Sequence, residues 1–356
     1  MNESCVELIR KLSEAAGPSG FEDEVLAVVR EAVPFIGRIE EDSLRNLYLY
    51  RKEHAGNKPV LMLDAHADEV GMMVQAVKPN GTLRFLEIGG IAYGSLPSAA
   101  VRVRNALGEY IPGVVAMKPP HFMGKDEKLQ FDGQSLVIDI GATSREEAEE
   151  VFHIRIGEPV VPATRCTFDE KNGLFFGKAF DDRIGVAALI ETLRRLDGKD
   201  LPCDVVGVIS SQEEVGDRGA RVAVRRVKPD VALCFEGCPA DDTFTEDYLI
   251  QTALKKGPMI RHMDRSIICN PRYQRWTMDL AEREEIPLQT AVRAGGGNNG
   301  AVINLADHGV PVIVAGIPVR YIHSMNCIAA YQDFDAAAAL ACAVAEKMTR
   351  EQIEAF

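Results

Sequence analysis

Apolar runs that end in acidic or histidine residues recur along this chain. Short runs rich in Val, Ile and Leu, bounded by polar or turn residues, are typical of strands buried in a parallel sheet. The carboxyl ends of such strands meet at one edge of the sheet, where ligands bind. We therefore expect the polar residues after these runs to share one site. The five segments are 61–70, 177–183, 205–216, 231–237 and 313–324.

The flanking pattern predicts an α/β core. Two amphipathic helices are expected over residues 4–16 and 22–33, followed by strands near Leu47 and Leu61. From Val186 onward, helical and strand patterns alternate, as they do in a doubly wound sheet. The predicted fold class is α/β, with a mixed sheet flanked by helices.

A β-rich segment interrupts this core between about residues 71 and 164. Short apolar runs there alternate with Gly, Pro and Asn turns, which favours a small barrel-like domain. One short helix is expected over 144–151, with Ser144 as its N-cap. The expected domains are therefore 1–70 with 165–356, and an insertion over 71–164. A final Ala-rich helix is expected over 334–354.

Glu213 and Glu214 stand side by side directly after the strand pattern of residues 205–209. A fold tolerates two adjacent like charges cheaply only in water or beside a cation. One glutamate could bind a metal while its neighbour transfers a proton, as in metal-assisted hydrolysis. The alternative interpretation of this pair is a solvated turn.

His66 and Asp68 end another apolar run and are two residues apart. An imidazole binds Zn²⁺ through one nitrogen, and a carboxylate on the other nitrogen fixes its tautomer. Asp68 could therefore orient His66 as a metal ligand.

The strand-end residues are numerous enough for two metal ions. Two such ions would be bound if one carboxylate bridges them, which leaves Glu213 and Asp68 for proton transfer and ligand orientation. Nitrogen and oxygen ligands without a thiolate suit Zn²⁺, Co²⁺ or Mn²⁺. The pattern thus predicts a dinuclear metal-dependent hydrolase. The candidate ligands are His66, Asp181, Glu214, Glu236 and His323.

Motifs spread over nearly the whole chain resemble the glutamyl-aminopeptidase/TET family of dinuclear metallo-aminopeptidases, a group with members once labelled cellulase M-like. The motifs are Gly-Pro-Ser-Gly-Phe-Glu at 17–22, the segments 64–68 and 177–183, Glu-Glu-Val-Gly at 213–216, and the segments 257–260 and 320–324. The resemblance implies a zinc-exopeptidase-like fold and the same five ligands, with Asp181 bridging. It also implies Glu213 as general base, Asp68 as the residue that orients His66, and a cis peptide bond after Asp181.

The resemblance further implies partners and cofactors. It predicts two divalent ions per subunit, Zn²⁺ first and Co²⁺ or Mn²⁺ as alternatives. The substrates would be short peptides with a free N-terminus. The β-rich insertion would mediate a homo-oligomer, from a dimer up to a dodecamer.

Three departures from the family pattern leave the preferred first residue of the substrate open. Glu236 stands where the family more often has Asp. Asn298 and Asn299 replace an expected Asp in a Gly-rich loop, which argues against a strictly basic preference. Residues 325–327 differ from the Pro and acidic residue of many relatives.

Composition narrows the partners. The chain has 356 residues, 46% hydrophobic and 26% charged, as in an ordinary soluble protein. A net charge of −13 disfavours nucleic acid or an anionic membrane as partner. Eight cysteines without a Cys-x-x-Cys pair, no signal segment and no apolar run of 18 residues predict a cytoplasmic protein with reduced thiols.

Other function classes stay open as alternatives. Residues 295–300 match Gly-x-Gly-x-x-Gly, but Arg320 rather than an acidic residue follows about 20 positions later. A glycoside hydrolase would leave the histidines without a role. A deacylase could use the same dinuclear site, and an assembly protein could carry an inactive one.

Overall fold

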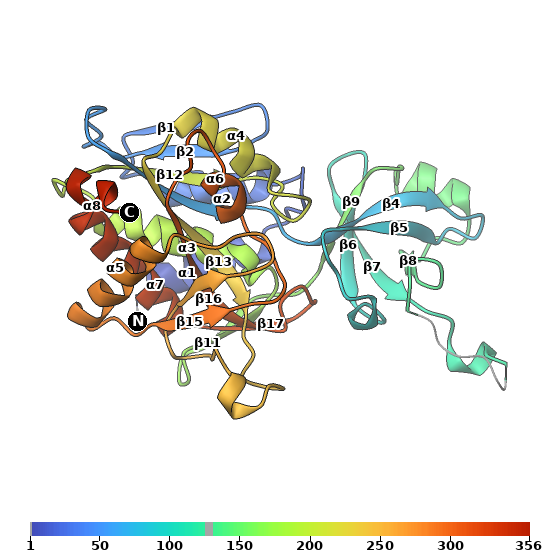
Figure 1. The fold of residues 1–356 in the computed structure, drawn as a ribbon. Coiled ribbons are helices and arrows are strands. Elements are labelled where there is room, and N and C mark those ends of the chain that lie inside the picture. The colour runs from blue at the N-terminus through green and yellow to red at the C-terminus, as the bar shows by residue number, and fades with distance from the viewer. Residues whose placement is uncertain (1, 125–130) are drawn as a thin grey trace.

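The computed structural model describes residues 2–124 and 131–356. The expected insertion contains residues 125–130, which lie outside the described residues. The chain forms two lobes, a large α/β body and a smaller β lobe joined to one side of it (Figure 1). The predicted combination of a mixed sheet with an inserted barrel is confirmed.

The large sheet is built around four parallel strands in the order β12, β3, β13 and β16. Antiparallel strands extend it on both sides, and a β14–β15 pair attaches to β16. In sheet order the strands are β1 (Arg38–Glu41), β2 (Leu47–Tyr50), β12 (Asp204–Ser210), β3 (Val60–His66), β13 (Val231–Pro239), β16 (Val312–Arg320), β17 (Cys327–Ala330), β11 (Leu174–Gly177) and β10 (Thr167–Asp169), with β14 (Met259–Met263) and β15 (Gln289–Val292) at the side.

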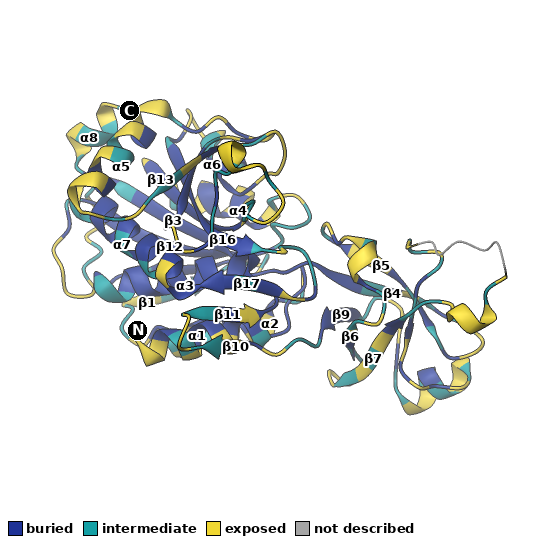
Figure 2. Ribbon diagram, turned by 90° about the horizontal axis from the view of Figure 1, so that it is seen from below, coloured by how far each residue is buried: buried dark blue, intermediate teal, exposed yellow. Residues whose placement is uncertain are grey.

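Helices cover both faces of this sheet, because alternate strand residues point to opposite faces and nearly all are apolar. Leu61 and Leu63 face the larger core with α3, whereas Met62 faces a second core with α4. The central strands are accordingly buried along almost their whole length (Figure 2). The helices are α1 (Glu3–Glu14), α2 (Asp23–Ala32), α3 (Phe180–Arg195), α4 (Arg218–Val227), α5 (Pro271–Arg283), α6 (Gly300–Asn304), α7 (Tyr331–Lys347) and α8 (Arg350–Glu354).

The smaller lobe is a closed six-stranded barrel with a core of its own. It leaves the large sheet after β3 and returns before β10, so it separates His66 from the later site residues in sequence. Its strands, in barrel order, are β4 (Gly71–Val77), β5 (Leu83–Ile88), β8 (Val137–Asp139), β7 (Tyr110–Ala116), β6 (Ala100–Arg104) and β9 (Pro159–Pro162).

Two predicted helices differ from the structure. The expected helix 334–354 is divided into α7 and α8, because the Thr349 side chain accepts a hydrogen bond from the Gln352 amide and caps a new helix. The expected helix 144–151 is α-helical only at residues 145–146 and continues as a π-helical turn, Glu147–Val151; the Ser144 hydroxyl accepts from the Glu147 amide at 3.2 Å, as an N-cap does. In the described part of the chain, no helix has the length and apolar character needed to cross a membrane.

Candidate active site

The carboxyl ends of the four central strands bring the candidate residues to one edge of the sheet. His66 ends β3, and its register partner Ser210 ends β12, three residues before Glu213. Glu236 lies two residues beyond the Cys234–Asp64 pair, which puts it level with His66. His323 follows β16 by three residues. Parallel alignment therefore gathers side chains that are far apart in sequence.

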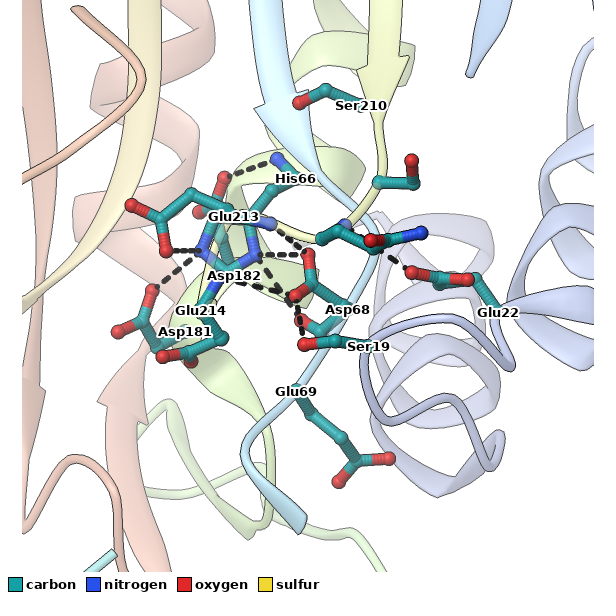
Figure 3. Close-up of polar contacts among 12 residues, drawn as sticks. Ser19, Glu22, His66, Asp68, Glu69, Asp181, Asp182, Ser210, Glu213 and Glu214 are labelled. Carbon is teal, nitrogen blue, oxygen red and sulfur yellow. Dashed lines mark hydrogen bonds and ion pairs between the residues drawn. The ribbon is translucent and has the colours of Figure 1, made fainter. Parts of the chain in front are cut away.

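The Asp181 carboxylate lies between two imidazoles. One oxygen is 3.1 Å from Nε2 of His66, and the other is 3.0 Å from Nε2 of His323 (Figure 3 shows the His66 side). Asp181 is in the first turn of α3, the helix that packs in the larger core against the central strands. Its two oxygens thus face two different histidines, which is the arrangement expected of a bridging ligand.

The opposite nitrogen of each imidazole is already satisfied. Nδ1 of His66 lies 3.1 Å from the main-chain carbonyl of Asp68, and Nδ1 of His323 lies 2.9 Å from that of Gly90. Each Nδ1 therefore donates its proton to a carbonyl oxygen, and in the neutral ring Nε2 carries a lone pair. That lone pair points at a carboxylate oxygen of Asp181. Two facing lone pairs repel unless a proton or a cation lies between them, so this donor set fits a metal ion.

The remaining carboxylates complete two groups of candidate ligands. Ligand atoms of His66, Asp181 and Glu214 lie within 4.8 Å of one another, and so do those of His66, Asp182 and Glu236. Oε1 of Glu214 is also 3.4 Å from Nε2 of His323. This oxygen is buried and has no hydrogen-bond partner among the described residues. Buried oxygens are rarely left without a partner, so this one fits the role of a metal ligand.

Asp182 also belongs to this cluster, although no role was predicted for its side chain. Its Oδ2 accepts the His66 main-chain amide at 3.2 Å, and it is fully buried. The Asp181–Asp182 peptide bond is cis, which confirms that expectation.

Asp68 lies behind His66 and holds the turn that carries the glutamate pair. Its carboxylate is 3.3 Å from Nδ1 of His66 and accepts the main-chain amides of Glu213 and Glu214 at 2.9 and 3.1 Å (Figure 3). The Glu213 side chain then reaches the cluster, with Oε2 3.9 Å from Nε2 of His66. One carboxylate thus aligns both a histidine and a candidate base.

The buried acidic groups of the site lie so close together that their protonated forms are favoured. Burial and the charge of Asp181 raise the pKa of Glu214 to about 8, and burial raises that of Glu236 well above its usual range. Burial opposes a charged His323, but its contact with Asp181 outweighs this and raises its pKa to about 9. Divalent cations would take the place of these protons, since metal binding releases protons from the ligands.

A cavity of about 470 Å³ opens onto this cluster. Residues of both charges line it, since the carboxylates of the site are joined there by Arg261 and Arg293. Arg261 is 3% exposed and donates to Asp264 at 3.0 Å, while Arg293 lies 2.9 Å from Asp241. The other lining residues include three successive glycines, Gly295, Gly296 and Gly297.

The structure brings together all seven residues chosen from the sequence, and it adds others. The Gly90 carbonyl, Arg261 and Arg293 come from loops or from strands outside the central four, so no strand-end pattern points to them. The hydroxyl of Ser19, which contacts Asp68, was visible only as part of the motif at 17–22.

Known proteins are similar to this chain over most of its length. Residues 46–340 match the M42 glutamyl aminopeptidase family. A lysyl aminopeptidase of Pyrococcus furiosus is 34% identical over 352 residues, which is 96% of this chain and 97% of the relative. A TET aminopeptidase from the archaeon Thaumarchaeota archaeon SCGC AB-539-E09 has a TM-score of 0.94 and 35% identity, covering 99% of both chains.

A second solved structure comes from an assembling relative. The TET1 peptidase of Pyrococcus horikoshii, described as able to assemble into a tetrahedron or a large octahedral shell, has a TM-score of 0.86 and 27% identity, over 97% of this chain and all of the other. The family and its named relatives support an aminopeptidase function, and peptidases of this family depend on metal. This chain belongs to the M42 glutamyl aminopeptidase family.

Proposed function

We propose that this chain is an aminopeptidase that works with two divalent metal ions. The observation that carries the proposal is the Asp181 carboxylate, whose two oxygens face Nε2 of His66 and Nε2 of His323 at 3.1 and 3.0 Å. Glu214 and Glu236 would complete the ligand set with these three residues. Zn²⁺ is the first expectation for the ions, with Co²⁺ or Mn²⁺ as alternatives.

Glu213 is the proposed general base and acid. When bound, divalent ions would supply Lewis-acid polarisation of the scissile carbonyl and lower the pKa of a water molecule. Glu213 accepts the proton of the attacking water and then delivers it to the leaving amine. Burial raises the pKa of Glu213 well above its usual range. Nearby cations oppose this rise and favour the ionised form that a base requires.

Asp68 has a supporting role in the proposed reaction. Its carboxylate holds His66 from the side away from the ligand atoms and fixes the turn before Glu213. The base and the histidine therefore keep one relative position. Positioning of this kind lowers the barrier because the reacting groups need no further ordering.

Acidic groups in the cavity support a requirement for a free α-amino group. Glu214 and Asp217 line the same cavity as Glu213, so a protonated amine next to the scissile bond would meet carboxylates there. An acetylated N-terminus cannot offer that charge.

The arginines of the cavity favour an acidic or polar first residue. Arg261 and Arg293 line the cavity, whereas their acidic partners Asp264 and Asp241 do not. A carboxylate side chain would gain charge-assisted hydrogen bonds from these arginines, and a lysine side chain would be repelled by them. The family is named for glutamyl and the relative for lysyl substrates, so the proposed preference rests on the residues of this chain.

Hydrolysis of matched peptides tests the proposed activity. One peptide series is prepared with free and with acetylated N-termini, and each is assayed with added Zn²⁺, Co²⁺ or Mn²⁺ and after chelation. Metal-dependent release of the first residue from the free peptides alone is expected. Removal of the acetyl group would instead identify a deacylase, and cleavage of both forms inside the chain would identify an endopeptidase.

Peptides that differ only in their first residue test the preference. Glu should exceed its uncharged isostere Gln, and Lys should be the poorest. In Arg293→Gln the Glu-to-Gln ratio should fall toward one while cleavage of Gln peptides is kept. Equal cleavage of Glu and Lys by the unaltered protein would contradict the preference but not the peptidase activity.

Assembly is proposed for the barrel. Residues 71–164 would mediate contacts between copies, and residues 1–70 with 165–356 would carry catalysis. The support is a barrel with a separate core and a relative that assembles into closed shells. Light scattering of the purified protein should give the mass of a dimer or of a larger assembly of dimers, and a monomer at micromolar concentration would contradict this.

A further inference from the structure

The motif at residues 17–22 lies directly against the proposed active site. It links α1 to α2, and its Pro18 pairs in a short parallel bridge with Glu69, the residue after Asp68. None of its residues is a proposed ligand or base. Its contacts nevertheless converge on the turn that carries Glu213 and Glu214 (Figure 3).

Three consecutive main-chain amides of that turn donate to buried carboxylates. The Gln212 amide donates to Oε1 of Glu22 at 3.2 Å, and the next two amides donate to Asp68 at 2.9 and 3.1 Å. Glu22 is 1% exposed, and Asp68 is fully buried. Successive amides that point at anions fix the path of a turn. The turn that carries Glu213 and Glu214 is therefore held by hydrogen bonds to two carboxylates on other segments of the chain.

Ser19 fixes one of these carboxylates. Its hydroxyl donates to Oδ2 of Asp68 at 2.6 Å, and the Ser19 residue is 8% exposed. Asp68 has no access to solvent, so protein donors must hold it. Without this hydroxyl, Oδ2 would keep only the Glu214 amide as a donor.

The motif is itself anchored by buried charges. Glu69 accepts the Gly17 amide at 3.2 Å and pairs with Lys178 at 2.6 Å and Arg183 at 3.3 Å. Arg183 also donates to the Gly17 carbonyl at 3.1 Å. Since Lys178 and Arg183 flank Asp181 in sequence, the motif connects the turn of the base to the start of α3.

We propose that Ser19 and Glu22 are positioning residues of the hydrolytic reaction, an inference that rests on the proposed aminopeptidase function. Ser19 aligns Asp68, which aligns His66 and the Glu213–Glu214 turn, and Glu22 holds the same turn at Gln212. Neither residue lines the cavity that opens onto the site. A misplacement of about 1 Å in a catalytic group can cost about 10²-fold in rate.

Kinetics of Ser19→Ala test the proposal. We expect kcat to fall by about 10- to 100-fold while KM stays within about twofold, because alignment is lost and the cavity is not. Ser19→Thr keeps a hydroxyl and should recover most of the rate. Thr277→Val is the matched control, since it removes a buried hydroxyl that donates at 2.9 Å within α5, outside the site.

Two readouts are independent of turnover. Zn²⁺ affinity, measured by competition with a chromophoric chelator, should weaken in Ser19→Ala. The loss should be smaller than the about 10- to 100-fold typical of removing a ligand's own hydrogen-bond partner, because Ser19 acts on the ligand His66 through Asp68. Amide hydrogen exchange over residues 212–214 should accelerate in Ser19→Ala and, at Gln212, in Glu22→Ala. Thr277→Val should change neither.

The outcomes separate this inference from the proposed function. If the unaltered protein cleaves no peptide, the proposed function fails, and Zn²⁺ affinity and exchange still decide whether Ser19 positions the site. Unchanged kcat, Zn²⁺ affinity and exchange in Ser19→Ala would overturn the inference. It would also be overturned if Thr277→Val reproduced the losses or if Ser19→Thr recovered none of them.

Discussion

The two histidines of the site are held in very different ways. The His66 side chain is 1% exposed, ends a central strand, and is fixed by the carbonyl and carboxylate of Asp68. The His323 side chain is 34% exposed, lies on a loop, and is held at Nδ1 by the carbonyl of Gly90. One half of the site is therefore part of the sheet, and the other half is formed where two loops meet.

The half of the site that contains His323, called the His323 half below, contacts the barrel, and the half that contains His66 is the His66 half. Gly90 follows β5 of the barrel, and Met325, two residues after His323, packs into the barrel core. The Thr164 hydroxyl also donates to the Met325 carbonyl at 2.6 Å. The His66 half depends on the sheet and the motif at 17–22, whereas the His323 half depends on how the two lobes meet. We expect the two metal positions to differ in affinity for this reason.

Glu213→Gln should have the largest effect on the rate of hydrolysis and should leave both metal positions occupied. The amide cannot accept the proton of the attacking water, so kcat should fall by about 10²- to 10⁴-fold. Metal content, measured by atomic absorption after gel filtration, should be unchanged. Activity near that of the unaltered protein would show that Glu213 is not the base.

Glu69→Ala should strongly destabilise the His66 half. The change leaves Lys178 and Arg183 buried without their shared carboxylate, which typically costs about 3–5 kcal/mol of unfolding free energy. Urea unfolding measures the loss. Glu7→Ala is the control, since its ion pair with Arg10 is exposed and should contribute about 1 kcal/mol or less. Equal effects of the two changes would contradict a structural role for the buried cluster.

Removal of each histidine should separate the two halves. His66→Ala should abolish the tighter Zn²⁺ position, and His323→Ala should weaken only the other one. Each loss of Zn²⁺ affinity should be larger than the decrease of about 10- to 100-fold that follows when only a ligand's hydrogen-bond partner is removed. Chelator competition gives both affinities. If both variants lose Zn²⁺ binding at the same position, the two histidines do not belong to separate halves of the site.

Thr164→Val should have the smallest effect on Zn²⁺ affinity. Only the metal position in the His323 half should be affected. The isosteric side chain removes one hydrogen bond between the lobes, at a cost of about 1 kcal/mol. The weaker Zn²⁺ affinity should drop by less than about tenfold, and the tighter one should not change. A change in the tighter affinity alone would reverse the assignment of the halves.

Much of the site arrangement follows from sequence, because it depends on strand ends. His66, Glu236 and the Glu213–Glu214 pair follow apolar runs, and parallel strands place such residues at one edge whatever their separation in sequence. The mixed sheet and the barrel were predicted for the same reason, since both rest on apolar periodicity.

The remaining features depend on loop paths, which periodicity does not encode. The Gly90 carbonyl meets His323, and Ser19 meets Asp68, only because of how the lobes and the first helices pack. The division of the last helix at Thr349 was missed for another reason: a threonine cap competes locally with a continuing Ala-rich pattern.

Calorimetric titration of the chelated protein with Zn²⁺ would count the metal positions around Asp181 and compare their affinities. Two equivalents should bind per chain with distinct affinities, and peptide hydrolysis should rise with the second. A single equivalent that restores full activity, or no binding at the proposed ligands, would contradict a site with two unequal metal positions around Asp181.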